Sequence, residues 1–313
     1  MLSVPMLQRH AELRKNTNEL SDFLSDSSTK FIINHRGRFV CSGGKPIYFS
    51  HVELAQATSI KLSLNNGKSV ETTYLGEMEA QHYFMLNIKQ LPEALETKEL
   101  LDLRTAAMNA NAFDISLLFY SQGLSNWHFS HAFCAKCGSE TATAQTGHSR
   151  VCCNADCGKE HFPRIEPAVI FSIQTTIENT PKILLARQPN WPKKRYSVIA
   201  GFAEHGESLE HAVAREALEE VGLEVSNIKY ISSQPWPFPA SLMLGFSSET
   251  KQHDICLVDE ELEHAQWLSA EEIKNQVEQG ELLMPYSVSI SWHLVDLWYR
   301  EQTGMSLKSL NSR

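Results

Sequence analysis

The stretch 201–223, GFAEHGESLEHAVAREALEEVGL, limits more than any other part of the sequence what this chain can fold into. Gly201 and Gly206 permit backbone angles that a Cβ atom would forbid, as a tight loop requires. Ser208 is a suitable N-cap, and Gly222 stands where a helix can end. The stretch therefore predicts a strand end, a tight loop and a short helix.

The expected helix carries three carboxylates on one face. Glu216, Glu219 and Glu220 are spaced i, i+3 and i+4, which brings side chains together on a helix. Bunched carboxylates repel one another unless a cation lies among them, and hard oxygen ligands suit Mg²⁺ or Mn²⁺. A solvated acidic face is the alternative. The residues expected to bury the helix against a sheet are Val213, Ala217, Leu218 and Val221.

The spacing of the whole stretch argues against that alternative. From Gly201, the sequence follows G-x5-E-x7-R-E-U-x-E-E-x-G-U, where U is aliphatic. It places Glu207 and Arg215 at the remaining charged positions. This pattern resembles the Nudix box, with Ala217 as the one departure, at a position where a larger aliphatic residue is usual. The resemblance implies a metal-dependent pyrophosphohydrolase.

Composition and charge narrow the class of protein further. The chain has 313 residues, which is long enough for two domains or for one domain plus modules. Of these residues, 42% are hydrophobic and 21% charged, as in an ordinary soluble globular protein. Its net charge of −9 gives no general attraction to nucleic acid or anionic membranes. No window reaches the roughly 18 apolar residues of a membrane helix, and residues 1–16 lack the apolar core of a secretion signal. We therefore expect a cytoplasmic protein without a membrane partner.

Five of the seven cysteines crowd into residues 134–157, which favours metal binding over disulfides in a cytoplasmic chain. Cys134 and Cys137 form one pair, and Cys157 forms a second pair with either Cys152 or Cys153. Four thiolates in a tetrahedron are typical of structural Zn²⁺ and leave no open position for water. The pattern predicts a zinc ribbon, with free cysteines in a loop as the alternative.

The ribbon, expected at residues 129–163, divides the chain. Residues 1–128 mix short apolar runs with Ala- and Leu-rich stretches, so we expect a small mixed α/β domain without a catalytic pattern. Residues 164–302 alternate strands and helices, and the acidic helix would pack on their sheet in an α/β/α sandwich. Residues 303–313 are expected to form a flexible tail.

The segment Ser233–Ser241, SQPWPFPAS, bears on the substrate. Its prolines stiffen the backbone around Trp236 and Phe238, and a rigid aromatic loop loses little entropy on binding a planar ring. A proline-rich connection with buried aromatics is the alternative. At this distance from the Nudix box, the segment resembles the signature of the NADH pyrophosphatase (NAD+ diphosphatase) branch of the Nudix family.

This second resemblance implies a Nudix sandwich preceded by a zinc ribbon and a small N-terminal domain, assembled as a homodimer. The activity implied is hydrolysis of the pyrophosphate of NADH or NAD+ to nicotinamide mononucleotide and AMP. Cys152, with its wider spacing to Cys157, is favoured as the zinc ligand. The implied Mg²⁺ or Mn²⁺ ligands are Glu216, Glu220, the carbonyl of Ala200, and Glu261, with Glu260 as the competing choice for the last.

The implied substrate positions lie in four parts of the chain. Phe162 stands where a tyrosine is usual, and the alignment of Arg104 needs a one-residue gap. Phe202 is a further aromatic candidate for holding a ring. The complete candidate set is Gln234, Pro235, Trp236, Pro237, Phe238, Pro239, Ala240, Ser241, Phe162, Phe202, Ser291 and Arg104.

The chemistry follows from charge. Divalent ions at the glutamates would neutralise the pyrophosphate and lower the pKa of a bound water. Glu219 would serve as a ligand or as the general base, and Glu207 with Arg215 as an ion pair that stiffens the loop. Two alternatives stay open: hydrolysis of ADP-ribose or of NAD-capped RNA, and a zinc-ribbon binding protein with an inactive Nudix fold.

Overall fold

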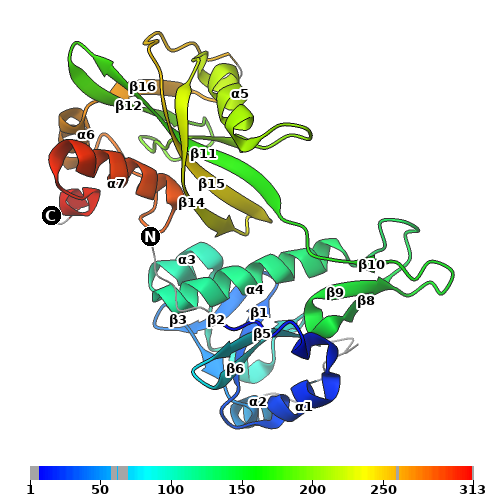
Figure 1. Cartoon of the computed structure of the whole chain (residues 1–313). Coiled ribbons are helices and arrows are strands. Elements are labelled where there is room, and N and C mark those ends of the chain that lie inside the picture. The colour runs from blue at the N-terminus through cyan, green and yellow to red at the C-terminus, as the bar shows by residue number, and fades with distance from the viewer. Residues whose placement is uncertain (1–6, 58–61, 63–69, 259–260, 312–313) are drawn as a thin grey trace. The chain divides into compact units, whose positions relative to one another are not determined.

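The computed structural model describes residues 7–57, 62, 70–258 and 261–311. The chain forms two compact units (Figure 1). The first contains Met1–Ile165 and Trp236–Ala240, and the second contains Glu166–Pro235 and Ser241–Arg313. Within the described ranges, no helix has the length and apolar character needed to cross a lipid bilayer.

A mixed sheet forms the centre of the first unit, in the order β3-β2-β1-β6-β5, with β4 beside β1 and β7 beside β2. Strands β1 and β6 pair in parallel, whereas β1 and β2 are antiparallel. The strands are β1 (Lys30–His35), β2 (Arg38–Ser42), β3 (Lys45–Pro46), β4 (Tyr48–Phe49), β5 (Val70–Met78), β6 (Gln81–Ile88) and β7 (Glu99–Asp102). The α-helices are α1 (Thr17–Ser25), α2 (His51–Ala57), α3 (Leu103–Met108) and α4 (Ala112–Ser130).

Both faces of this sheet are buried. Successive side chains of a strand point to opposite faces, so neighbouring residues of β1 enter different cores. Phe31 packs in the same core as Leu20 of α1. Ile32 packs in the other core, with Leu118 of α4. Figure 1 shows α1 and α2 on one side of the sheet and α3 and α4 on the other.

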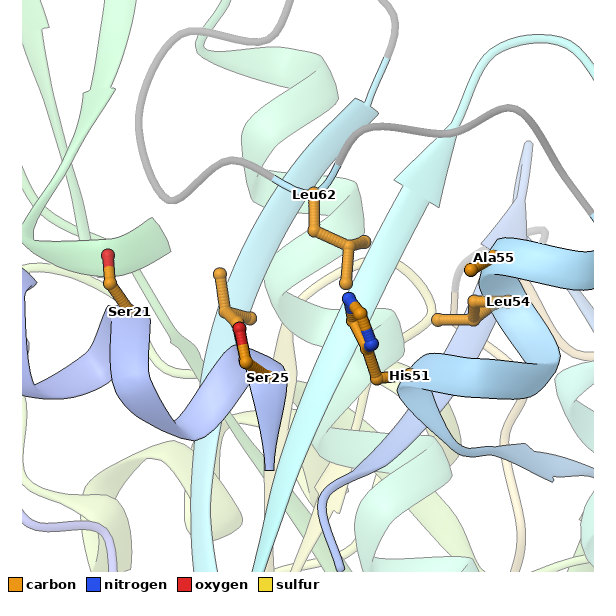
Figure 2. Close-up of a pocket in the computed structure, with 7 residues that line it drawn as sticks. Ser21, Ser25, His51, Leu54, Ala55 and Leu62 are labelled. Carbon is orange, nitrogen blue, oxygen red and sulfur yellow. The ribbon is translucent and has the colours of Figure 1, made fainter. Parts of the chain in front are cut away.

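A cavity of about 510 Å³ lies between α1 and α2 (Figure 2). Its wall combines the hydroxyl groups of Ser21 and Ser25 with the imidazole of His51 and aliphatic side chains. The aliphatic part consists of Leu24, Leu54, Ala55 and Leu62. The acidic and cysteine motifs of the sequence contribute nothing to this wall.

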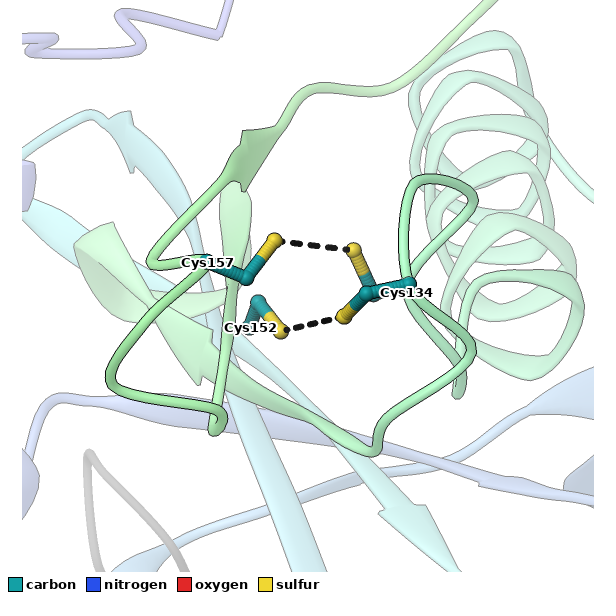
Figure 3. Close-up of side chains that lie close together, drawn as sticks. Cys134, Cys152 and Cys157 are labelled. Carbon is teal, nitrogen blue, oxygen red and sulfur yellow. Dashed lines mark hydrogen bonds between the residues drawn. The ribbon is translucent and has the colours of Figure 1, made fainter.

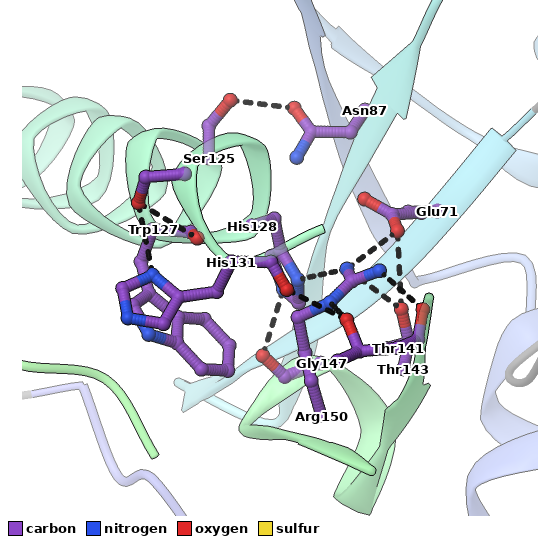
Figure 4. A network of polar contacts seen from close by, with 11 residues as sticks. Glu71, Asn87, Ser125, Trp127, His128, His131, Thr141, Thr143, Gly147 and Arg150 are labelled. Atoms are coloured by element: carbon purple, nitrogen blue, oxygen red, sulfur yellow. Dashed lines mark hydrogen bonds and ion pairs between the residues drawn. The ribbon is translucent and has the colours of Figure 1, made fainter. Parts of the chain in front are cut away.

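The predicted ribbon follows α4 as a small antiparallel sheet in the order β10-β9-β8. Its strands are β8 (Thr141–Ala144), β9 (Ser149–Cys152) and β10 (Glu160–His161). Arg150 of β9 is buried and lies between the ribbon and the larger sheet. Its guanidinium donates to the hydroxyl and carbonyl oxygens of Thr141, at 2.8 and 2.9 Å, and forms a 2.8 Å ion pair with Glu71 of β5 (Figure 4).

His128 of α4 completes this network. Arg150 donates to its Nδ1 at 3.0 Å, and its Nε2 donates to the carbonyl oxygen of Gly147 at 2.9 Å. Because an Arg can only donate, the imidazole is held as the neutral tautomer with its proton on Nε2. Burial, more than any neighbouring charge, lowers the pKa of His128 to about 4.

The second unit contains a sheet in the order β14-β15-β11-β12-β16, with β13 beside β11. Its strands are β11 (Glu166–Ile177), β12 (Thr180–Arg187), β13 (Ile199–Phe202), β14 (Ser226–Trp236), β15 (Ser241–Glu249) and β16 (His264–Leu268). Its α-helices are α5 (Leu209–Val221), α6 (Ala270–Glu278) and α7 (Ile290–Thr303). Ser269 caps α6 through the predicted N-terminal contact, accepting from the backbone N–H of Glu272.

The predicted α/β/α sandwich is confirmed. Phe171 of β11 packs in one core with Val213 of α5, whereas the adjacent Ile170 packs in the other with Val295 of α7. One expectation for α5 is wrong, because Leu218 is 52% exposed and does not face the sheet. The apolar arc of this helix is therefore narrower than its sequence suggested.

The expectation of a flexible tail does not hold for residues 303–311. A 3₁₀ turn at η4 (Leu307–Asn311) follows α7, and Leu307 is buried in the same core as α7. The carboxylate of Asp296 on α7 accepts hydrogen bonds from the Leu307 N–H and the Ser306 hydroxyl, each at 2.7 Å. These contacts join residues more than one helical turn apart. The sequence of the short polar tail therefore did not predict them.

Acidification is expected to destabilise the fold through His128. Its pKa is about 4 in the folded protein, against roughly 6.5 in an unfolded chain. The unfolded chain therefore binds the extra proton first as pH falls, and the stability that the neutral imidazole contributes is lost between pH 6.5 and 4. We expect a loss of about 1–2 kcal/mol between pH 7.5 and 5, measured by urea unfolding.

His128→Gln is the matched control, because glutamine offers one donor and one acceptor but does not titrate. This variant should lose less stability than the unmodified protein over the same pH interval. An equal loss in both proteins would contradict the assignment.

Candidate active site

The structure places the acidic helix as the sequence predicted. Helix α5 begins after Ser208, whose hydroxyl accepts from the His211 N–H at 3.2 Å. It ends at Gly222, which adopts a left-handed φ of 68°. The N–H groups of Gly222 and Leu223 then bond to the carbonyls of Leu218 and Ala217. Both ends of the helix are therefore capped, and its N-terminal end follows directly on the loop.

Arg215 occupies the centre of the polar face of α5 and uses all of its N–H groups. Nε and one Nη2 hydrogen bind the two oxygens of Glu207, at 3.1 and 2.7 Å, and Nη2 also binds the Phe202 carbonyl at 2.8 Å. Nη1 binds one oxygen of Glu216 at 2.9 Å and one of Glu219 at 2.8 Å. The predicted ion pair with Glu207 is thus part of a larger fork.

Glu207 is the anchor of the loop. Besides its two bonds from Arg215, its carboxylate accepts from the Glu204 N–H at 2.7 Å. The hydrogen bonds from Arg215, followed by the one from this backbone, lower the pKa of Glu207 to about 2. The carboxylate is therefore ionised at neutral pH and ties the loop to the helix.

Gly201 provides the space in which Glu216 lies. A Cβ atom on Gly201 would overlap the Glu216 carboxylate, so a larger residue here would displace that side chain. Ala200 precedes it on β13, in antiparallel register with Ile170 of β11. The strand thus brings the backbone of the loop next to an acidic side chain.

The carboxylates of α5 are crowded and partly desolvated. Burial raises the pKa of Glu216, and the charges of Glu219 and Glu261 raise it further against the lowering effect of Arg215. Glu220 is buried. Glu261 therefore lies within electrostatic reach of Glu216, while the competing Glu260 falls outside the described residues.

Within the described ranges, no three of these carboxylates lie as close together as the four cysteine sulfur atoms do. Mg²⁺ is usually held by one or two carboxylates together with waters and substrate phosphates, so a tighter cluster is not required. Across the described ranges, only the cysteine cluster brings three or more possible metal ligands within 4.8 Å of one another. Arg215 takes one oxygen from Glu216 and one from Glu219, which leaves the second oxygen of each carboxylate outside the fork. Hard oxygen donors and the mutual repulsion of the carboxylates fit Mg²⁺ or Mn²⁺.

The proline-rich segment is shorter as a loop than the sequence suggested. Strand β14 continues through Trp236, and the turn covers residues 237–240. The residues of Trp236–Ala240 belong to the first unit. There the Trp236 ring meets Phe119 edge-on at 6.3 Å, and the Arg104 guanidinium lies 4.2 Å over the Phe238 ring. Arg104 thus contacts Phe238, a residue predicted to bind the substrate.

Two other candidates bind protein atoms at the start of α7. The Gln234 amide donates to the Val288 carbonyl and accepts from the Ile290 N–H, both at 2.7 Å. Ser291 is buried, with its hydroxyl 2.9 Å from that of Ser289. Phe202 and Phe162 are each more than half exposed, at 55% and 52%. The aromatic candidates therefore differ in how far their rings are already in contact with the protein.

The cysteine cluster is a zinc-binding site. The sulfur atoms of Cys134, Cys137, Cys152 and Cys157 all lie within 4.8 Å of one another. The sulfur atoms of Cys134 and Cys157 are 3.8 Å apart, and those of Cys137 and Cys152 are 3.4 Å apart. Figure 3 labels Cys134, Cys152 and Cys157 of this cluster. Tetrahedral Zn²⁺ with bonds of about 2.3 Å places its sulfur ligands about 3.8 Å apart. The four thiols therefore fit Zn²⁺, and Cys153, which is exposed, lies outside the cluster.

The surroundings of the cluster favour the thiolate form at Cys137 and Cys134, whereas burial raises the pKa of Cys152. Hydrogen bonds from Ser139 lower the pKa of Cys137 to about 6. The His161 Nε2 lies 3.3 Å from the Cys134 sulfur, where an N–H group would stabilise a thiolate. Sequence reasoning missed His161, because a residue that supports a ligand leaves no spacing pattern of its own.

Replacing Cys152 with serine is expected to remove the bound zinc and to lower Tm, because three thiolates cannot close the tetrahedron. The neighbouring Cys153→Ser is the control and should leave both quantities unchanged. Zinc content by metal analysis and thermal unfolding measure the effect. The reverse result, with zinc lost only from Cys153→Ser, would show that the wrong thiol has been assigned.

Three family models match the chain in order. Residues 28–127 match the NADH pyrophosphatase-like rudimentary NUDIX domain, residues 130–162 the NADH pyrophosphatase zinc ribbon domain, and residues 168–285 the NUDIX domain. Each range lies inside one of the domains proposed from the sequence. The kinship of the first domain with NUDIX was missed, because that domain contains no Nudix box to recognise.

Relatives of known name match over most of the chain. The NAD-capped RNA hydrolase NudC of Mycobacterium bovis (strain BCG / Pasteur 1173P2) is 32% identical over 312 residues, covering 95% of both chains. The Pseudomonas aeruginosa (strain LESB58) protein of the same name is 34% identical and covers 74% of this chain and 77% of its own. The mouse mitochondrial NAD(P)H pyrophosphatase NUDT13 is 38% identical over 66% of this chain and 61% of its own. The chain therefore belongs to the NADH pyrophosphatase/NudC family of Nudix hydrolases.

Proposed function

We propose that this Nudix hydrolase cleaves the pyrophosphate of NADH or NAD+ to nicotinamide mononucleotide and AMP, with divalent ions held by Glu216, Glu220 and Glu261. The observation that carries the proposal is the fork of Arg215, which fixes Glu216 and Glu219 on one face of α5, with Glu216 against the backbone of Gly201. Family membership gives the reaction class, and the geometry of α5 supports the residue roles.

The residues of this site have two proposed roles: some bind the divalent ions, and others position the loop. Glu216, Glu220 and Glu261 would hold Mg²⁺ or Mn²⁺, with the Ala200 carbonyl as a further oxygen ligand. When bound, such ions neutralise a pyrophosphate and lower the pKa of a coordinated water. Glu207 and Arg215 position the loop, and Glu219 acts as an additional ligand or as the base that takes the proton of the attacking water.

Aromatic side chains would select what is attached to the pyrophosphate. Trp236 and Phe238 are already oriented by contacts with Phe119 and Arg104, so little entropy is lost when a base packs against them. Exposed Phe202 and Phe162 offer further ring faces. Gln234 and Ser291 would act through the start of α7, which they brace.

NAD-capped RNA is the second candidate substrate. It contains the same pyrophosphate, and the relative aligned over 95% of both chains is named for that activity. The net charge of −9 opposes tight binding of a long polyanion and favours the free dinucleotide. We propose a homodimer for either substrate, as the family resemblance implies. Turnover of both substrates by one preparation at several salt concentrations would rank them.

Glu220→Gln is expected to lower kcat for NADH about a hundredfold or more while leaving the fold intact, because a neutral amide binds a divalent ion poorly. Chromatographic detection of AMP with Mg²⁺ or Mn²⁺ measures turnover, and thermal unfolding monitors the fold. Glu210→Gln is the matched control, since Glu210 is exposed in the first turn of the same helix. A folded Glu220→Gln protein with most of the original kcat would disprove this assignment.

A further inference from the structure

One side chain of α4 binds two carbonyl groups of the turn that follows Trp236. The Asn126 amide nitrogen donates to the carbonyls of Pro237 at 3.0 Å and Pro239 at 2.8 Å. These prolines have no N–H group, so their backbone can form hydrogen bonds only through the carbonyl oxygens. An amide NH₂ group, with two donors and no acceptor, matches that requirement.

A chain of amides fixes the direction in which Asn126 points. The Gly37 N–H donates to the Asn34 Oδ1 at 2.9 Å, and Asn34 donates to the Gln122 Oε1 at 3.4 Å. Gln122 in turn donates to the Asn126 Oδ1 at 2.6 Å. We name Asn34, Gln122 and Asn126 the amide relay. Along the amide relay, each side chain accepts a hydrogen bond through its oxygen and donates one through its NH₂ group. The first oxygen accepts from the Gly37 N–H, and the last NH₂ group donates to the carbonyls of the two prolines.

The direction of the amide relay is set at its origin. A backbone N–H can only donate, so it requires the oxygen of Asn34 to face Gly37. Asn34 and Gln122 are 1% and 6% exposed, so water cannot easily satisfy a reversed amide. Reversing one member would face oxygen with oxygen or nitrogen with nitrogen, at the cost of buried unpaired groups. The NH₂ group of Asn126 is thereby directed at the turn.

We propose that the amide relay positions the turn Trp236–Ala240, and that Asn126 is a positioning residue for recognition of the aromatic base of a dinucleotide. The inference rests on the proposed function, in which Trp236 and Phe238 hold that base. It concerns the choice of substrate and not the chemistry of the acidic helix. Asn126 itself need not touch the substrate.

Asn126→Asp tests the inference with little change in size. Aspartate still accepts from Gln122 but has no N–H group, so its carboxylate would face two carbonyls. We expect KM for NADH to rise about tenfold, as the loss of two hydrogen bonds suggests, with kcat within about twofold. KM for a base-free diribosyl pyrophosphate should not change. Hydrogen–deuterium exchange of residues 233–241 should become faster.

Tyr48→Phe is the control for a general loss of polar contacts to α4. The Tyr48 hydroxyl donates to Asp114 at the other end of that helix, at 2.5 Å. This variant should leave both KM values and the exchange of residues 233–241 unchanged. If Tyr48→Phe also raised KM for NADH and sped up the exchange of residues 233–241, the effect of Asn126→Asp would be explained by a less stable helix α4. That result would overturn the inference.

Gln122→Glu provides an independent test if Asn126→Asp fails to fold. A carboxylate at this position accepts hydrogen bonds only, so the Asn126 amide would reverse and turn its NH₂ group away from the prolines. The same rise in KM for NADH is expected with Asn126 intact. Unchanged exchange in both variants, or faster exchange without a change in substrate preference, would overturn the inference. Absence of NADH hydrolysis in the unmodified protein would instead refute the proposed function, while exchange would still test the relay.

Discussion

The guanidinium of Arg215 holds together the part of the chain on which the proposed chemistry depends. It joins the Phe202 carbonyl, at the end of a strand, to Glu207 in the loop and to Glu216 and Glu219 on α5. Without this cation, the carboxylates would repel one another. A lysine could not replace it, because a single ammonium has three donors and lacks the planar fork. The five hydrogen bonds of Arg215 thus order the loop and the carboxylates of α5 relative to one another.

Helix α4 plays a comparable part in the first unit, through hydrogen-bonding groups inside a mainly apolar core. His128 near its C-terminal end accepts from Arg150 of the zinc ribbon, and Gln122 and Asn126 continue the amide relay toward the proline-rich turn. Both networks have directions fixed by groups that can only donate, an arginine in one and a backbone N–H in the other. Directional bonds of this kind specify one arrangement where apolar packing alone would allow several.

Short sequence patterns predicted the features of the structure that depend on interactions between residues close together in the sequence. The caps of α5 at Ser208 and Gly222 and the zinc ribbon could be predicted because each is set by short spacing. The choice of Cys152 over Cys153 rested on the family resemblance. The docking of residues 303–311 and the amide relay depend on contacts between residues far apart in the sequence. A local sequence pattern could therefore not predict them. Leu218 fell on the expected apolar arc but is exposed, because the sheet covers only part of that arc. The roles of the individual glutamates were inferred from resemblance and stay proposals.

The central claim is that the carboxylates ordered by Arg215 gather divalent ions. Anomalous diffraction from a crystal of the protein with Mn²⁺ and a non-hydrolysable dinucleotide tests it most directly. The account predicts anomalous peaks roughly 2.1 Å from the carboxylate oxygens of Glu216 and Glu220, next to the pyrophosphate. Peaks confined to other parts of the molecule, in a protein that hydrolyses NADH, would contradict it.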